Sequence, residues 1–466
     1  MQLNSYSYLA LLLVAVPVFW LIPVALRRPY VLVLSFAFYA SWTWTYAALP
    51  LLICAVAFLC ARRILASPGN ADAAMWTGTA VILTILAFFK YRQFLFDNIN
   101  GMLHVFGQLP ARSIVLAGLP PGISFYSFEA ISYLIDSRQG RAKRISFQDL
   151  CIFVAFWPHL IAGPIVRARE LVPQLEFKRP FDVNMLMQGI DRLVLGLVQK
   201  NLIANNLAPW VDMGFLAQAA DANTTVDNWF FAFAFGLQIY FDFTAYSNMA
   251  IGAARLIGIT LPENFNYPYH AGNPADFWSR WHMTLSRWIR DYLFFPVAAR
   301  LQSSPVALSF TLVGTMAFVG LWHGAGWGFV LWGCLHGLYL VLYRAWERLG
   351  WNSPALCVRV VTILAVMAAW IPFRAATLHQ AMLMLRSLVV PNRLYPSYSI
   401  NFYLITLLVM LFVVMEPVLA TRLRALAERI VLPANLLLFR PAIYACGLLL
   451  FLIFDDRDTQ FIYFQF

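Results

Sequence analysis

Charged side chains are scarce in this sequence, since Asp, Glu, Lys and Arg make up 12% of its 466 residues. Soluble globular proteins carry about 25%. Hydrophobic residues make up 61%, and the mean hydropathy is +0.68. These values exclude a disordered protein, a typical cytosolic enzyme and a reader of nucleic acids, so we expect no nucleic-acid partner. The composition predicts an all-helical protein that crosses the membrane several times and contacts lipid.

Cysteine is also rare, and its spacing indicates neither a metal site nor a disulfide framework. The six cysteines include no Cys-x-x-Cys pair, and most lie in apolar runs. We therefore expect no structural disulfide and no bound metal. The first 26 residues carry no charge, and Arg27 and Arg28 follow them. Because a cleavable signal peptide begins with basic residues, this order indicates a retained first helix whose amino end lies outside the cytoplasm.

The basic residues form short clusters between apolar runs. There are 33 Lys and Arg against 22 Asp and Glu, which gives a net charge of +11. Pairs such as Arg62-Arg63, and the cluster from Arg138 to Arg144, are typical of loops that remain in the cytoplasm. The alternative is that some of these bases bind an anionic acyl donor.

Apolar runs follow one another without a long polar linker, so we expect a single membrane domain over residues 1–466. Candidate spans begin near Tyr6, Tyr30, Ala74, Leu186, Trp229, Val306, Gly328, Val358, Tyr403 and Pro441. An arginine pair flanks each end of residues 30–61, and one straight span would separate the two pairs. A hairpin that breaks between Ser41 and Pro50 keeps both pairs on the same side.

The segment Phe147–Val166 is apolar but contains two prolines, and basic loops lie on both sides of it. If both loops are cytoplasmic, the segment enters the membrane and returns. Such backbone is tolerated only where protein or a water-filled cavity satisfies its polar groups. The alternative is a kinked helix that lies on the surface.

Polar side chains within apolar runs are costly in a membrane and therefore mark candidate sites. Residues 301–343 contain no Asp, Glu, Lys or Arg, and His323 lies near the middle in a glycine-rich stretch. The length fits two helices with His323 near their junction. A neutral imidazole accepts a proton near pH 7, so His323 is a candidate general base. The alternative is a packing histidine, a role that suits His336 better.

A second polar cluster lies in residues 274–296, where a proline near each end favours a helix start and stop. As one amphipathic helix, this segment presents an apolar stripe, with His282 on the opposite flank. The stripe consists of Phe277, Trp281, Leu285, Trp288 and Tyr292. Arg280 and Arg287 are candidates for binding the phosphates of a donor. The alternative is an interfacial anchor whose arginines extend to water.

Asp242 lies in the middle of the apolar run 235–247. A carboxylate there needs a partner, which we expect to be an arginine or histidine of the two clusters above. A structural ion pair and a catalytic acid both remain open.

The carboxyl end combines an acidic group at 455–458 with an apolar tail at 459–466. The apolar part is too short to span a membrane, so we expect it to dock in a groove. Tyr463 carries the only hydroxyl of its last six residues, and interfacial anchoring is the alternative role for this side chain.

These motifs together resemble the membrane-bound O-acyltransferases, in particular the bacterial alginate O-acetyltransferase branch, over nearly the whole chain. The motifs that carry the resemblance are Pro158–Pro164, Tyr240–Phe243, Pro262–Asn266, Phe277–Pro296, Leu321–Gly324 and Phe461–Phe466. The resemblance implies an all-α fold of about eleven membrane helices, with re-entrant and amphipathic helices around a central tunnel.

By the same resemblance, His323 is the family's hallmark histidine and His282 its second polar position. We then expect His323 to act as the base on the accepting hydroxyl and His282 to polarise the thioester. The further candidates for the donor site or the tunnel are Arg280, Arg287, Asp242 and Trp322. The tail resembles the carboxyl-terminal signature of a small partner in teichoic-acid D-alanylation, which makes Tyr463 a candidate acyl relay.

The function that the resemblance implies is transfer of acetyl groups from cytoplasmic acetyl-CoA, a substrate and not a resident cofactor, to an exported alginate- or cellulose-type polysaccharide. The enzyme would lie in the bacterial inner membrane beside periplasmic acetyltransferase-type partners and a polysaccharide synthase. Two alternatives remain open: a transporter or flippase of an acyl or sugar intermediate, and an O-acyltransferase with a lipid or protein acceptor.

Overall fold

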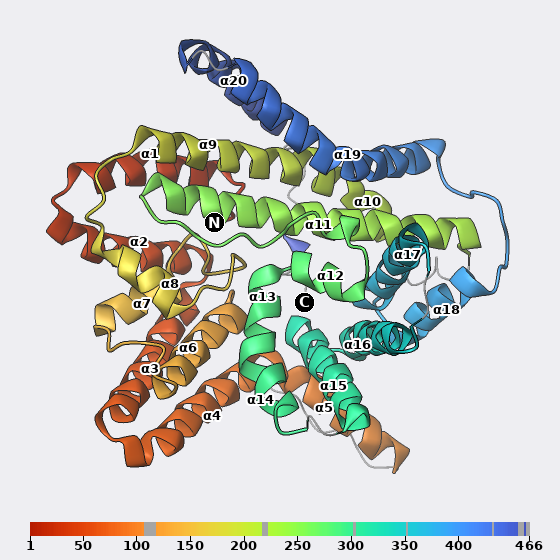
Figure 1. Ribbon diagram of the computed structural model, residues 1–466, viewed down its shortest axis with the longest axis horizontal. Coiled ribbons are helices and arrows are strands. Elements are labelled where there is room, and N and C mark those ends of the chain that lie inside the picture. The colour runs from red at the N-terminus through yellow and green to blue at the C-terminus, as the bar shows by residue number, and fades with distance from the viewer. Residues whose placement is uncertain are drawn as a thin grey trace. The chain divides into compact units, whose positions relative to one another are not determined.

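The computed structural model describes residues 1–106, 118–216, 222–301, 304–350, 353–430, 433–454 and 461–462. Within these residues every regular element is a helix and no strand occurs, which confirms the predicted all-α class (Figure 1). Two compact units are present: the first comprises residues 1–193 and 249–262, the second 194–248 and 263–466. Each is described by itself, and the expected single membrane domain stays a prediction.

Six helices in the described part of the chain are long and apolar enough to cross a membrane. They are Trp44–Ala66, Ala71–Lys90, Pro305–His323, Trp327–Arg348, Ala355–Arg374 and Ile400–Arg422. Two shorter apolar helices are Tyr6–Leu21 and Pro441–Phe454. Since about 20 apolar residues of helix span the hydrocarbon core, the protein is a multi-pass membrane protein. The expected number of about eleven spans stays a prediction.

The first unit is built from helices that follow the predicted apolar runs. Its elements are α1 (Tyr6–Leu21), α2 (Val24–Trp42), η1 (Trp44–Tyr46), α3 (Ala48–Ala66), η2 (Pro68–Asn70), α4 (Ala71–Lys90), α5 (Arg92–Val105), α6 (Ile123–Arg138), α7 (Phe147–Ala155), α8 (Ala168–Leu171), η3 (Val172–Glu176) and the first part of α9 (Val183–Val198). Helices α3, α4 and α6 pack against one another, and α7 packs against α2 and α3. The break between α2 and α3 falls at residues 43–47, inside the predicted interval from Ser41 to Pro50, whereas the return of the chain as a hairpin stays a prediction.

The segment Phe147–Val166 is not a spanning helix. Helix α7 ends at Ala155, and the turns that follow are buried, which contradicts the alternative of a helix on the surface. Glu129 of α6 satisfies part of this irregular backbone: its Oε1 accepts the Val166 amide at 3.1 Å and lies 3.3 Å from Nδ1 of His159. One buried carboxyl group therefore fixes two points of the turn.

The Glu129→Ala substitution would leave two buried donors, the Val166 amide and the His159 ring, without their acceptor. We expect each lost acceptor to lower the free energy of unfolding by about 1–3 kcal/mol. Thermal unfolding of the purified protein in detergent, followed by tryptophan fluorescence, measures the change. The control is Asp72→Ala, which removes the pair with Arg138 on a carboxylate that is 67% exposed. Equal stability of the two variants would contradict the assigned role of Glu129.

The second unit holds both predicted histidine segments. Its elements are the end of α9, the π-helical turn η4 (Gln199–Ala204), α10 (Asn205–Gly214), α11 (Thr225–Leu256, as far as Asn248), η5 (Pro268–His270), α12 (Pro274–Arg280), α13 (Met283–Ile289), the π-helical turn η6 (Arg290–Phe294), α14 (Phe295–Ala298), α15 (Pro305–His323), α16 (Trp327–Arg348), α17 (Ala355–Arg374), α18 (Leu378–Val389), α19 (Ile400–Ile430) and α20 (Pro433–Phe454).

Helices α15 and α16 form a close pair whose junction carries His323. A Cβ atom added at Gly320 would collide with the Phe329 carbonyl oxygen, and one at Gly333 with the Met316 carbonyl oxygen. Glycine at these positions lets the two backbones approach each other closely. His323 is the last residue of α15, which confirms its predicted place at the junction.

The prediction of one continuous helix over residues 274–296 is wrong. The chain starts helix α12 at Pro274 as expected, but it breaks at Trp281 and His282 before α13 begins. The predicted apolar stripe is nevertheless buried on both sides of the break. Packing therefore preserves the hydrophobic face, while a tertiary contact interrupts the helix.

Candidate functional site

The break in the helix is centred on His282. Its backbone has φ of 41°, in the left-handed region that non-glycine residues seldom adopt. This conformation costs about 1–2 kcal/mol, so surrounding contacts must maintain it. The ring is completely buried, and its centroid lies 4.6 Å from that of Phe243 on α11 in an edge-to-face arrangement.

Asn264, in the loop after α11, supplies the contacts that maintain the break. Its backbone carbonyl accepts the Met283 amide at 2.9 Å, and two residues later the Asn266 amide donates to the Arg280 carbonyl at 3.0 Å. The side-chain oxygen of Asn264 accepts from the Thr284 hydroxyl at 2.9 Å. These bonds provide partners for backbone groups that a broken helix leaves exposed.

The same amide determines the hydrogen-bonding state of His282. Asn264 Oδ1 accepts from the Thr284 amide, and its Nδ2 donates to the Ser247 hydroxyl, so the orientation of the amide is defined. Nδ1 of His282 lies 3.1 Å from Asn264 Oδ1 and must donate to it. Nε2 then carries the lone pair. Burial lowers the pKa of His282 to about 3, so the ring is neutral near pH 7.

His323 lies next to His282 in the second unit. The two ring centroids are 6.3 Å apart, and the Trp322 ring is 6.3 Å from His282. His323 is 4% exposed, with the rings of Trp332 and Phe373 at 5.2 and 5.5 Å. The structure thus brings together three predicted residues, two buried imidazoles and an indole, among aromatic side chains.

The predicted packing role of His336 agrees with its surroundings. Its ring stacks on Phe277 at 5.8 Å with an interplanar angle of 10°, and Trp332 lies 4.9 Å away. The Phe277 contact connects α16 with α12, four residues before the break at Trp281.

The two candidate donor-binding arginines differ in their partners. Arg280 forms an ion pair with Asp276 at 2.7 Å. Arg287 donates to the Met283 carbonyl at 3.2 Å, and no carboxylate of the described residues pairs with it. Arg287 is therefore the better placed to accept a new anion. Among described residues there is also no group of three or more His, Cys, Asp or Glu that could hold a metal.

The expected partner of Asp242 was wrong. The partner is Lys200 of the π-helical turn η4, whose Nζ lies 2.7 Å from Asp242 Oδ1, with both side chains buried. Asp242 Oδ2 also accepts the Ile462 amide at 2.7 Å, and the Phe461 ring lies 4.9 Å from Tyr246. These contacts favour the structural alternative for Asp242. The tail docks at residues 461–462, whereas Tyr463 lies outside the described residues.

No role was predicted for Asn264 or Thr284, and Lys200 was not among the candidate residues. A lone lysine in the apolar stretch 193–204 was a usable signal, because a buried cation needs a buried anion. The roles of Asn264 and Thr284 had no such signal, since amide and hydroxyl side chains are common in loops.

Removing Lys200 would test the buried ion pair. Lys200→Met leaves the Asp242 carboxylate buried without a cation, and we expect a loss of about 3–5 kcal/mol in the free energy of unfolding. Adding Asp242→Asn should restore most of it, since an amide oxygen still accepts the Ile462 amide. Thermal unfolding in detergent measures both variants. A Lys200→Met protein as stable as the unaltered one would refute the pairing.

Comparison with known proteins identifies the family. Residues 28–385 match the model of the membrane-bound O-acyltransferase family. A probable alginate O-acetylase of Azotobacter vinelandii is 38% identical over 371 residues, 78% of this chain and 72% of that protein. Its counterpart in Pseudomonas aeruginosa is 38% identical over 365 residues, 76% of this chain and 68% of that protein.

A third relative has a different polymer in its name. The peptidoglycan O-acetyltransferase of Helicobacter pylori is 34% identical over 394 residues, 77% of this chain and 73% of that protein. Together with the family match and the buried histidine pair, these relatives lead to one conclusion. The chain belongs to the membrane-bound O-acyltransferase family, and it is an O-acyltransferase that crosses the membrane several times.

Proposed function

We propose that this enzyme transfers acetyl groups from acetyl-CoA for the O-acetylation of an exported polysaccharide at the bacterial inner membrane. The acceptor class is inferred from the alginate and peptidoglycan acetylases among its relatives. The observation that carries the proposal is the pair of buried imidazoles whose centroids lie 6.3 Å apart. Across such a distance, nitrogen atoms of both rings can accept hydrogen bonds from neighbouring groups of the reactants.

In the proposed reaction, His323 accepts the proton of an attacking hydroxyl, whose oxygen bonds to the thioester carbonyl carbon. The carbon–sulfur bond then breaks, and the thiolate of coenzyme A takes the proton back from His323. This general-base step is worth about 10²–10⁴-fold in rate. The hydroxyl belongs to the polymer or to a periplasmic partner that passes the acetyl group on.

His282 takes a different role from the one expected. Polarising a thioester carbonyl requires an N–H donor, but Nδ1–H of the neutral ring is engaged by Asn264. Nε2 presents a lone pair. His282 therefore accepts a hydrogen bond, from a neighbouring hydroxyl of the acceptor or from the departing thiol. Arg287, which has no carboxylate partner among the described residues, binds the phosphates of the donor.

His323→Ala should reduce transfer of radiolabelled acetyl groups from acetyl-CoA to polysaccharide by about 10²–10⁴-fold, because the attacking hydroxyl loses its base. Scintillation counting of the isolated polymer measures the transfer at equal protein levels. The matched control is His379→Ala on α18, an exposed histidine. Normal labelling by the His323→Ala protein would rule out the base assignment. If the unaltered protein labelled a lipid and not the polysaccharide, the proposed polysaccharide acceptor would be wrong.

Asn264 variants separate orientation of His282 from support of the fold. Asn264→Leu removes the acceptor for Nδ1–H, and we expect acetyl transfer to fall at least about tenfold. Asn264→Asp keeps an acceptor oxygen and adds a negative charge that raises the pKa of His282. The acid limb of the pH–rate profile should then move to higher pH.

A purely structural asparagine gives a different pattern. Both variants would then lower the amount of folded protein, and the pH–rate profile of the remaining enzyme would be unchanged. That result would remove His282 from the proposed mechanism without affecting the assignment of His323.

A further inference from the structure

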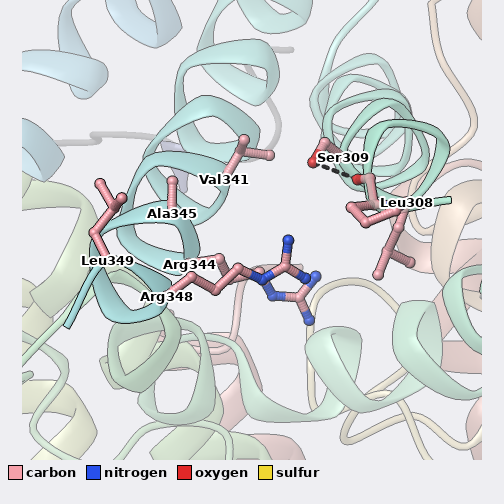
Figure 2. A pocket seen from close by; sticks show the side chains of 8 residues that line it. Leu308, Ser309, Val341, Arg344, Ala345, Arg348 and Leu349 are labelled. Atoms are coloured by element: carbon pink, nitrogen blue, oxygen red, sulfur yellow. Dashed lines mark hydrogen bonds between the residues drawn. The ribbon is translucent and has the colours of Figure 1, made fainter.

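A cavity of about 280 Å³ lies between the first turns of α15 and the last turns of α16. Its lining consists of Pro305, Leu308, Ser309, Val341, Arg344, Ala345, Arg348 and Leu349 (Figure 2). A helix rises 1.5 Å per residue, so Leu308 lies about 22 Å from His323 along α15. The cavity is therefore separate from the histidine pair, at the opposite end of the same two helices.

Two guanidinium groups extend into this cavity. Arg344 and Arg348 are four residues apart, so they lie on the same face of α16, and Figure 2 shows both side chains reaching into the space between the helices. No carboxylate lines the cavity, and neither arginine forms an ion pair with any described residue. Adjacent like charges destabilise a helix, and a bound anion would remove that cost.

The neighbouring groups of opposite charge do not neutralise this pair. A second cavity, of about 400 Å³, shares Arg344 and is also lined by Asp276 and Glu347. Asp276 is already paired with Arg280 at 2.7 Å. Asp276 and Glu347 thus line the adjoining cavity, whereas the cavity between α15 and α16 is lined by the two arginines and by no carboxylate.

Apart from Ser309, the rest of the lining is apolar. It consists of Pro305, Leu308, Val341, Ala345 and Leu349. Along the same helix ends, Val306 is 65% exposed and Phe310 75% exposed. Both helices are candidate membrane spans, so we expect these exposed side chains to face lipid near the end of the span. A positive cavity beside a lipid-facing surface fits an amphiphile better than a soluble ion.

We propose that this cavity binds the phosphate head group of an anionic phospholipid. Arg344 and Arg348 bind the phosphate oxygens, a geometry that guanidinium groups favour. The acyl chains extend over the exposed apolar surface of α15 and α16. Basic pockets between membrane helices are a recurrent form of lipid recognition. The site does not depend on the proposed acetyl transfer.

Native mass spectrometry of the full-length protein in detergent tests this site. The probes are phosphatidylglycerol and phosphatidylcholine with identical chains. We expect the unaltered protein to prefer phosphatidylglycerol. The double variant Arg344→Gln/Arg348→Gln should weaken its binding about thirtyfold, with little effect on phosphatidylcholine. The matched control, Arg62→Gln/Arg63→Gln, removes the same charge from the end of another apolar helix and should bind like the unaltered protein.

A second variant tests whether the double arginine variant loses phosphatidylglycerol because of misfolding. Ala345→Trp keeps both arginines but fills the cavity at an exposed position, and it should also lose phosphatidylglycerol. Undiminished binding by either cavity variant overturns the proposal, as does an equal loss in the Arg62/Arg63 control. Competition with inorganic phosphate and coenzyme A identifies the source of the phosphate. Displacement of the lipid by either one at equal concentration would show a soluble-anion site and also overturn it.

Discussion

The hydrogen bond between Asn264 and His282 is the contact on which the arrangement of the site depends. Without it, residues 274–296 have the composition of a continuous amphipathic helix, in which His282 would lie on a flank away from the apolar stripe. The loop around Asn264 bonds to the backbone on both sides of the break and so holds His282 in a left-handed conformation. The ring is thereby directed towards the end of α15, where His323 lies. One amide thus determines both the position of the imidazole and which of its nitrogens carries the proton.

The two histidines lie in aromatic surroundings, and burial there lowers the pKa of His282 to about 3, so its ring is neutral near pH 7. Aromatic rings from α11, α15, α16 and α17 enclose them, and these rings exclude water while offering no opposite charge. The nearby ion pair, Lys200 with Asp242, neutralises itself. Charge in this ion pair thus joins segments of the second unit, whereas the proposed acetyl transfer uses the two imidazoles.

Much of the fold follows from the apolar runs alone. A helix covers each of the predicted starts, although α2 begins six residues before Tyr30 and α20 eight residues before Pro441, and the break at residues 43–47 lies where the flanking arginine pairs predict one. His323 was predictable because a polar side chain stands out in 43 residues without charge. The kink at His282 was not, since it depends on a residue 18 positions earlier in the chain. Local sequence predicts a continuous helix from its periodicity. Hydrogen bonds from a distant loop can interrupt that helix when they pair with the backbone groups at the break.

The docking of Ile462 on Asp242 has a consequence for biosynthesis. The two residues are 220 positions apart in the chain. At about 5–20 residues per second, translation needs roughly 10–40 seconds to cover such a separation. During that interval Asp242 of α11 can pair with Lys200, but the Ile462 amide has not yet been synthesised. The Asp242 carboxylate therefore gains its second hydrogen-bond partner only after the end of the chain has left the ribosome.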